Sequence, residues 1–329
     1  MQAKAQKRLA IGVDLGGTNT RVALIDGDFS ESTQNVAEKV IELKRAKTPV
    51  KEGPAETARV IAELCSELSQ TAQKNFGVKP LGVGIGSPGP LSRKTKTIFQ
   101  TPNLPGFEGY PLGGEVQKLC GLPVLLDNDA KCAAFGEEFF GAAKGLKNFI
   151  LLTFGTGIGG GVVVDGEMVY GKSDGACEIG HMTLYPEGLQ CKCGNRGCFE
   201  QYCSATAIER RATAALCSAP NAKGSAANAK DLIEAFDKNE AWAKTCMKEV
   251  SRDFAIACAS LVNIFDPEAI ILGGGVFTTG GGPLPMLIQD EIKSRCFESS
   301  QRGLQICPSR LAGNAGILGA ASLIFRSMG

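Results

Sequence analysis

The chain has 329 residues, of which 43% are hydrophobic and 21% are charged, and its 35 basic side chains nearly balance 34 acidic ones. This is the composition of an ordinary globular protein, and the length favours two domains or lobes over a single hydrophobic core. A net charge of +1 gives no global basic field, which argues against binding to nucleic acid or to an anionic membrane.

The apolar runs of the sequence are short. The run at 149–152 is far below the length of a membrane span, and the N-terminal residues lack the apolar core and cleavage site of a signal peptide. We therefore expect a cytoplasmic protein. Because the cytoplasm keeps thiols reduced, the 13 cysteines are expected to bind metal where they cluster and to pack as small apolar side chains elsewhere.

Apolar strands and amphipathic helices alternate along the first half of the chain. A first pair of strands is joined by a Gly-Gly-Thr turn, and the elements that follow are separated by glycine and proline. Strands are expected at 9–14, 21–26, 38–44, 81–86 and 123–128, and helices at 53–73, 111–121 and 129–143.

The second half opens with a hairpin at 151–166 that resembles the hairpin at 11–27. The two segments align without gaps, so that Gly16 falls on Gly155. This repeat predicts two lobes of similar topology, although any two glycine-rich hairpins look alike. The overall alternation predicts an α/β fold with mostly parallel sheets. Helices are expected at 202–216, 231–239, 240–265 and 314–325, a strand at 269–275 and an exposed loop at 219–230.

Three glycine clusters suggest contacts with phosphate. The segment 155–160 satisfies G-x-G-x-x-G, but the strand-forming sequence Gly-Val-Val-Val follows it where a dinucleotide site needs a helix. No G-x-x-x-x-G-K-[ST] motif occurs either. Two Gly/Thr hairpin turns, whose backbone N–H and threonine hydroxyl groups donate to phosphate oxygens, would instead clamp a triphosphate. The cluster at 271–276 would let a base and ribose approach the backbone.

The only histidine, His181, precedes three clustered cysteines, Cys191, Cys193 and Cys198. A disulfide knot, a nucleic-acid-binding zinc module and a structural metal site are the three interpretations. One imidazole and three thiolates form a closed tetrahedral zinc site, which leaves no position for a reacting water. Acidic side chains around the cysteines argue against nucleic acid. We therefore expect a structural Zn²⁺ that holds a long irregular loop in place.

Asp127, Asn128 and Asp129 stand where a buried strand ends and a helix begins. Ligands of α/β sheets bind at such strand ends, and a carboxylate there can act as a general base. The alternative is that Asp129 only caps the helix, because Asp is a favoured N-cap residue.

Taken together, the motifs DLGGTNTR, NDA, TFGTGIGGG, EIGH, CKCGNRGCFE and LGGGV resemble, in order and spacing, those of the ROK sugar kinases, the bacterial-type glucokinases and their relatives. The resemblance covers residues 8 to about 323. It implies a two-lobed actin-like (ribonuclease H-like) ATPase fold with duplicated hairpin phosphate loops. The small lobe would be 1–130 with the C-terminal helix at about 313–329, and the large lobe 131–312, with the zinc-binding loop at 177–201.

The resemblance also implies roles for individual residues. Asp129 would be the catalytic base, and Lys131 replaces the asparagine that usually follows two residues after it. The residues that would bind the sugar are Gly89, Asn103, Asn128, Asp129, Glu178, His181 and Glu200. Those that would bind ATP and Mg²⁺, the latter at Asp14, are Asp14, Gly16, Gly17, Thr18, Asn19, Thr156, Gly157, Gly274 and Gly275.

The expected activity is ATP-dependent phosphorylation of an aldohexose at O6, with glucose as the first choice and a homodimer as the expected assembly. N-acetylmannosamine, N-acetylglucosamine, fructose and allose are alternative acceptors, and polyphosphate is an alternative donor. A sugar-responsive regulator without turnover is a more distant alternative. The repressors of the family carry a helix-turn-helix before the first phosphate motif, whereas only about ten residues precede it in this sequence.

Overall fold

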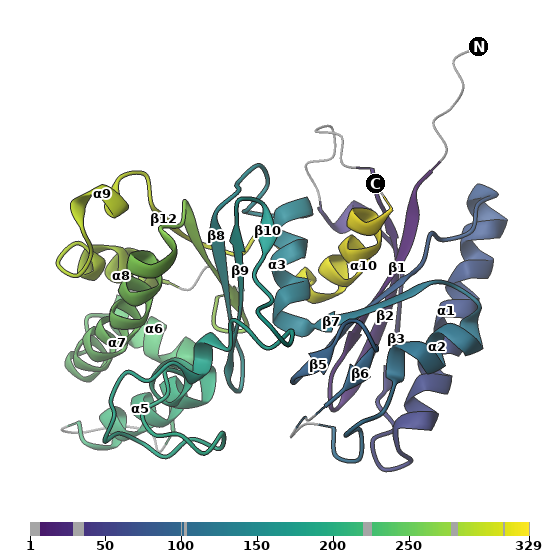
Figure 1. Cartoon of the computed structure of the whole chain (residues 1–329). Helices are drawn as coiled ribbons and strands as arrows, with labels where there is room; N and C mark the ends of the chain where they lie inside the picture. The colour runs from purple at the N-terminus through teal and green to yellow at the C-terminus, as the bar shows by residue number, and fades with distance from the viewer. Residues whose placement is uncertain are drawn as a thin grey trace. The chain divides into compact units, whose positions relative to one another are not determined.

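A computed structural model describes residues 7–28, 36–99, 101, 104–219, 226–277, 282–311 and 313–328 (Figure 1). The chain divides into two compact units. Unit 1 runs up to Lys144 and also includes Tyr170–Ala176 and the segment from Asn314 onward, and unit 2 consists of Gly145–Val169 and Cys177–Gly313. The loop expected at 219–230 lies partly outside the described residues.

Unit 1 is built on a five-stranded sheet in the order β3-β2-β1-β4-β7. β2 pairs antiparallel with both β3 and β1, whereas β1, β4 and β7 run parallel. Nearly every residue of β1 and β4 is buried, as expected for strands covered on both faces. The strands are β1 (Leu9–Leu15), β2 (Asn19–Asp26), β3 (Val40–Lys47), β4 (Val83–Ser87) and β7 (Val124–Asn128).

Unit 2 repeats this topology. Its sheet has the order β10-β9-β8-β11-β12, again with two antiparallel pairings followed by two parallel ones. The strands are β8 (Phe149–Phe154), β9 (Ile158–Val164), β10 (Glu167–Met168), β11 (Ala269–Gly274) and β12 (Gln305–Pro308). Since β8 and β9 correspond to β1 and β2, the sequence repeat does mark two sheets of one design.

The sheet of unit 1 lies between two pairs of helices: α1 and α2 on one face, α3 and α10 on the other (Figure 1). The helices are α1 (Pro54–Phe76), α2 (Leu112–Cys120), α3 (Asp129–Phe140) and α10 (Ala315–Ser327). The 3₁₀ helix η1 (Val36–Lys39) precedes β3, and β5 (Leu91–Ser92) pairs with β6 (Thr97–Ile98) in a small separate sheet. Because α3 packs along α10, unit 1 extends past residue 130, the boundary that the resemblance suggested.

Glycines allow α10 to approach the sheet and α3 at backbone distance. A Cβ on Gly12 of β1 would lie 2.0 Å from the Ile317 oxygen, and one on Gly84 of β4 would lie 1.7 Å from the Ala320 oxygen. A Cβ on Gly319 would lie 1.5 Å from the Cys132 oxygen of α3. No side chain fits at these three positions, so the glycines determine how closely α10 packs against β1, β4 and α3.

The core of unit 2 centres on four phenylalanines that join the sheet, the helices and the cysteine segment. Phe154 of β8 lies 4.9 Å from Phe254 of α7 (Ala241–Phe265), 5.0 Å from Phe277 and 6.3 Å from Phe199, measured between ring centroids. Phe199 directly follows Cys198, so burial of this ring fixes one end of the cysteine segment in the core.

The remaining helices of unit 2 are η2 (Ile179–His181), α4 (Glu200–Cys203), α5 (Ala205–Cys217), α6 (Ala229–Asp237), α7 (Ala241–Phe265), α8 (Leu284–Ile292) and α9 (Glu298–Gln301). Among the described residues, none of the helices is both long enough and apolar enough to span a membrane.

Candidate active site

In unit 1, β7 ends at Asn128 and α3 begins at Asp129. The side chain of Asn128 caps the helix: its Oδ1 accepts from the backbone N–H groups of Ala130 at 2.9 Å and Lys131 at 3.2 Å. Asp129 is the first helical residue and is exposed to solvent. The N-cap is therefore Asn128 and not Asp129, although Asp129 Oδ1 also accepts from the Ala130 N–H at 2.8 Å.

The neighbouring end of β4 leads toward Gly89, another predicted sugar-binding residue. Ser87 of β4 pairs with Asn128 of β7, and Gly89 follows two residues later with a φ of +86°. Unit 1 thus brings Gly89 and the Asn128–Asp129 pair to the same edge of its sheet. Asn103 lies outside the described residues.

The first Gly/Thr turn connects β1 to β2. The Gly16 N–H donates to the Asn19 oxygen at 3.0 Å, and Thr48, just beyond β3, donates its hydroxyl to the Gly16 oxygen at 2.6 Å. These bonds fix the backbone while Thr18 and Asn19 remain exposed at the tip, with Gly17 beside them. A fixed turn with exposed donors suits a phosphate group.

Asp14 is the penultimate residue of β1, one residue before this turn. Its Oδ2 is 3.6 Å from Arg21 Nη1, and Arg21 also donates to Asn314, directly before α10, at 2.6 Å. Burial raises the pKa of the Asp14 carboxyl, and the nearby Arg21 opposes that rise. A partly desolvated carboxylate beside a phosphate turn is a donor that fits Mg²⁺, which takes one or two carboxylates and fills its other positions with water and phosphate.

The second Gly/Thr turn lies in unit 2 between β8 and β9. The Gly155 N–H donates to the Gly157 oxygen at 3.0 Å, and Thr156 is exposed. At the end of the adjacent strand β11, Gly274 has a φ of +90° and a Cβ there would lie 2.2 Å from the Phe154 oxygen. Unit 2 therefore gathers the turn, Gly274 and the exposed Gly275 at the ends of two neighbouring strands.

The four predicted zinc ligands come together in unit 2. The ligand atoms of His181, Cys191, Cys193 and Cys198 all lie within 4.8 Å of one another. Cys193 Sγ is 3.6 Å from Cys198 Sγ, and Cys191 Sγ is 3.7 Å from His181 Nδ1. Tetrahedral coordination with zinc–sulfur bonds of about 2.3 Å gives sulfur–sulfur edges of about 3.8 Å, so the cluster fits Zn²⁺. None of the 13 cysteines, all of which are described, forms a disulfide.

Glu200 links this cluster to the second Gly/Thr turn. Its Oε1 is 3.2 Å from Cys191 Sγ and 3.8 Å from His181 Nδ1. A Cβ on Gly157 would lie 2.6 Å from the Glu200 Oε2. The structure therefore brings Glu200 and His181 together beside the turn, while Glu178 is exposed directly before η2.

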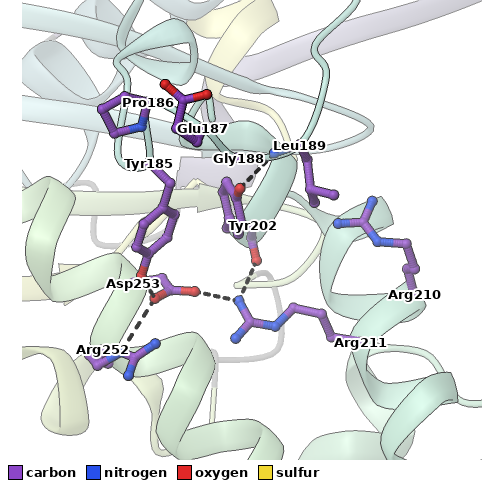
Figure 2. Close-up of a pocket in the computed structure, with 10 residues that line it drawn as sticks. All are labelled: Tyr185, Pro186, Glu187, Gly188, Leu189, Tyr202, Arg210, Arg211, Arg252 and Asp253. Carbon is purple, nitrogen blue, oxygen red and sulfur yellow. Dashed lines mark hydrogen bonds and ion pairs between the residues drawn. The ribbon is translucent and has the colours of Figure 1, made fainter. Parts of the chain in front are cut away.

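The sequence did not predict the polar network next to the zinc-binding loop at 177–201. Figure 2 shows this network. Asp253 of α7 is 2% exposed and accepts from the Tyr185 hydroxyl at 2.6 Å and from Arg211 of α5 at 2.7 Å. The network adjoins a pocket of about 780 Å³ lined by Tyr185, Pro186, Glu187, Gly188, Leu189, Tyr202, Arg210, Arg211, Arg252 and Asp253. No motif joins these residues. The only signal in the sequence is an aspartate, Asp253, within the apolar periodicity of the helix expected at 240–265.

Comparison with known proteins finds relatives over nearly the whole chain. The sequence model of the ROK family matches residues 10–327. The glucokinase of Thermotoga maritima is 36% identical over 97% of this chain and 98% of its own. A ROK family glucokinase from Streptomyces griseus, whose crystal structure contains glucose and AMPPNP, is 31% identical with a TM-score of 0.72 over 97% of this chain and 99% of its own. The xylose repressor of Bacillus subtilis is 30% identical over 78% of this chain and 64% of its own.

The chain belongs to the ROK family. The two-lobed actin-like α/β fold expected from the sequence, with its duplicated hairpins, is confirmed.

Proposed function

We propose that this hexose kinase transfers the γ-phosphoryl group of ATP to O6 of glucose. The observation that carries the proposal is the strand end of unit 1, where Asn128 caps α3 and leaves Asp129 as an exposed carboxylate that is not needed as the cap. Glucose as the acceptor is supported by the likeness to glucokinases over nearly the whole chain.

In this mechanism Asp129 accepts the proton of the 6-hydroxyl while O6 attacks the γ-phosphorus. The O6–phosphorus bond forms, the bond from phosphorus to the β–γ bridging oxygen breaks, and ADP leaves with the bonding electrons. The proton ends on Asp129. General-base assistance of this kind accounts for roughly 10²–10⁴ in rate, and the remainder comes from positioning and charge stabilisation.

The sugar hydroxyls would be bound by Glu178, His181 and Glu200. Carboxylates suit this task because each sugar hydroxyl is a donor. In His181, Nδ1 is the atom beside Cys191 Sγ, which leaves Nε2 as the ring nitrogen for a hydroxyl. Zn²⁺, held by the imidazole and the three thiolates, would supply a fixed geometry for the loop and take no part in the reaction. Asn128, Gly89 and Asn103 complete the proposed set.

The nucleotide would be bound by backbone donors of the two Gly/Thr turns. The exposure of Thr18, Asn19 and Thr156 at the tips of the turns supports this role, since each turn has donors for phosphate oxygens and glycines that admit close approach. Mg²⁺, bound near Asp14, would neutralise charge on the transferred phosphoryl group. Gly274 and Gly275 offer flat backbone to the base and ribose.

A panel assay tests the proposal directly. Formation of the sugar phosphate is measured for glucose, N-acetylmannosamine, N-acetylglucosamine, fructose and allose, with ATP or polyphosphate as donor, because transfer from polyphosphate releases no ADP. The proposal expects the highest kcat/KM for glucose with ATP. A higher kcat/KM for another acceptor would move the specificity to that sugar, and a switch to polyphosphate would replace the donor.

A sugar-responsive regulator without turnover is the second candidate, because a xylose repressor is among the relatives. Glucose binding measured by calorimetry, together with no ADP release from any acceptor, would favour it. Asp14 and Asp129 argue for turnover, since a sensor needs neither a metal-binding carboxylate nor a base.

The proposal also places the enzyme in the cytoplasm as a homodimer. Thirteen cysteines without a disulfide suit a reducing compartment. Light scattering coupled to gel filtration would measure the assembly, and a mass of one chain would contradict the dimer.

A further inference from the structure

The zinc loop, defined as Met182–Cys198, has a fastening besides its metal ligands. In the part of the chain that the structure describes, this loop contains no helix and no strand of the two main sheets. Two points at which it is fixed are Tyr185, whose side chain contacts α7 and α4, and Leu189, whose backbone N–H donates to Tyr202 of α4 (Figure 2).

Tyr185 connects the loop to α7. Its hydroxyl donates to Asp253 Oδ1 at 2.6 Å, and the accepting carboxylate is buried and charged, which strengthens the bond. Asp253 is in turn balanced by Arg211 at 2.7 Å and by Arg252 at 3.6 Å. Burial raises the pKa of the Tyr185 hydroxyl, and the bond to Asp253 raises it further, so the hydroxyl stays a donor.

Tyr202 forms the second half of the same anchor. Its hydroxyl accepts from the Leu189 N–H at 2.9 Å, and its backbone oxygen accepts from Arg211 at 3.1 Å. The rings of Tyr185 and Tyr202 pack edge to face with centroids 4.8 Å apart. Arg211 and Asp253 therefore hold one tyrosine by its hydroxyl and the other by its backbone.

This anchor is joined to the zinc ligands by close backbone contacts. The Leu184 N–H donates to the Gly197 oxygen at 2.8 Å, and a Cβ on Gly197 would lie 1.6 Å from the Tyr185 oxygen. Gly197 directly precedes the ligand Cys198. Tyr202 follows Glu200 by two residues within α4. A shift of either tyrosine would therefore be transmitted to a zinc ligand or to a proposed sugar ligand.

We propose that Asp253, paired with Arg211, is a metal-independent anchor of the zinc loop and a positioning residue for Glu200 and His181. The proposal rests on the proposed function only for what these two side chains bind. The anchor works by fixing Tyr185 and Tyr202, and it touches neither the sugar nor the metal.

Zinc release tests the anchor without any activity. Tyr185→Phe removes one hydrogen bond and keeps the ring, Asp253→Asn keeps the shape and removes the charge, and Tyr110→Phe in unit 1 is the matched control. Transfer of zinc to a coloured chelator is expected to be about tenfold faster in both variants, which corresponds to about 1.4 kcal/mol, because each variant weakens a hydrogen bond to a charged group. Release at the rate of wild type and control would overturn the proposal.

Trypsin cleavage after the exposed Lys192 and Arg196 gives a second readout in zinc-depleted protein. If the anchor holds the loop without metal, depleted Tyr185→Phe is cleaved severalfold faster than depleted wild type. Equal cleavage would mean that the metal alone holds the loop. Should Asp253→Asn fail to fold, Tyr185→Phe carries both measurements.

The positioning role is tested by steady-state kinetics. The variants are expected to raise the KM for hexose severalfold and leave the KM for ATP unchanged, whereas a merely structural role would lower the active fraction and leave both KM values as they are. That second pattern would overturn the positioning role. Absence of turnover in the wild-type enzyme would refute the proposed function, while zinc release and cleavage would still decide on the anchor.

Discussion

Asp129 is exposed in the first turn of α3, and the cap of that helix is supplied by Asn128. Replacing Asp129 with Asn keeps the size and polarity of the side chain but removes the proton acceptor. We expect Asp129→Asn to lower kcat by roughly 10²–10⁴ and to change the KM for hexose by no more than severalfold. Steady-state ADP release measures both constants.

The matched control is Asp165→Asn, which changes an exposed aspartate in the β9–β10 turn at a φ of +51° that Asn also tolerates. Turnover of Asp129→Asn near that of the control would exclude Asp129 as the base.

At this scale the sequence was informative where one short segment carries the chemistry. The spacing of His181, Cys191, Cys193 and Cys198 predicted a tetrahedral cluster because three of the four ligands lie within eight residues. Asp253 could not be found in this way. Its partners Tyr185 and Arg211 are 68 and 42 residues away, and only the fold brings them together.

Lys131 of α3 forms a hydrogen bond with the segment Tyr170–Ala176, which belongs to unit 1. Lys131 is 3% exposed and donates to the Asp174 oxygen at 2.6 Å. Tyr170 donates to the buried Asp127 at 2.6 Å, and Arg93 lies 3.5 Å from the centre of the Tyr170 ring. Burial raises the pKa of the Asp127 carboxyl, and the hydrogen bond from Tyr170 opposes that rise. Lys131, which departs from the family motif, thus helps to fasten this segment to α3.

Lys131→Met keeps most of the buried side chain and removes its charged donor. The Asp174 oxygen then loses this partner, so we expect a loss of about 1–3 kcal/mol in the free energy of unfolding. We also expect faster tryptic cleavage after Lys172, which is exposed within the segment. Urea denaturation and mass analysis of the fragments measure the two effects.

Lys172→Met removes the cleavage site itself and identifies the fragment, and its stability is expected to match the wild type because the side chain is exposed. Unchanged stability and unchanged cleavage in Lys131→Met would show that the segment is held by Tyr170 and Arg93 alone.

The close packing of α10 against the sheet depends on glycines that local secondary-structure propensity does not explain. Gly84 stands in a strand, where glycine is unfavourable, but a Cβ there would meet the Ala320 oxygen at 1.7 Å. We expect Gly84→Ala to destabilise the protein by about 1–3 kcal/mol, because the helix must move or the strand must bend. Thermal and urea unfolding measure the change.

Gly114→Ala in α2 is the opposite case, since no atom lies within 4 Å of a Cβ at that position. The added methyl group should stabilise the helix by about 0.4–1 kcal/mol. If both variants lost the same stability, close packing of α10 would not be the reason for the glycine at position 84.

For the whole molecule, the ungapped hairpin repeat predicted two sheets of one design, and both have the same order and pairing. The sequence could not supply α8 and β12, which have no strong pattern: α8 begins after Pro283, and β12 has only four residues. Nor could it assign Tyr170–Ala176 to unit 1, because that assignment depends on contacts of Tyr170 and Asp174 with residues far earlier in the chain.

Removal of zinc should affect the two units differently. All four ligands belong to unit 2, and a bound zinc ion would cross-link the zinc loop at these four side chains, so metal binding adds to the stability of that unit. We expect about one zinc per chain in the isolated protein and less in Cys193→Ser, because a structural zinc site needs four protein ligands and the variant keeps only three. Calorimetry should show a lower unfolding temperature for Cys193→Ser, with hydrogen exchange increased in unit 2 and unchanged in unit 1.

The control Cys217→Ser alters an exposed thiol of α5 outside the cluster and should keep both zinc and stability. Chelator-washed protein that held no zinc yet kept full activity and the wild-type unfolding temperature would show that the loop does not need the metal.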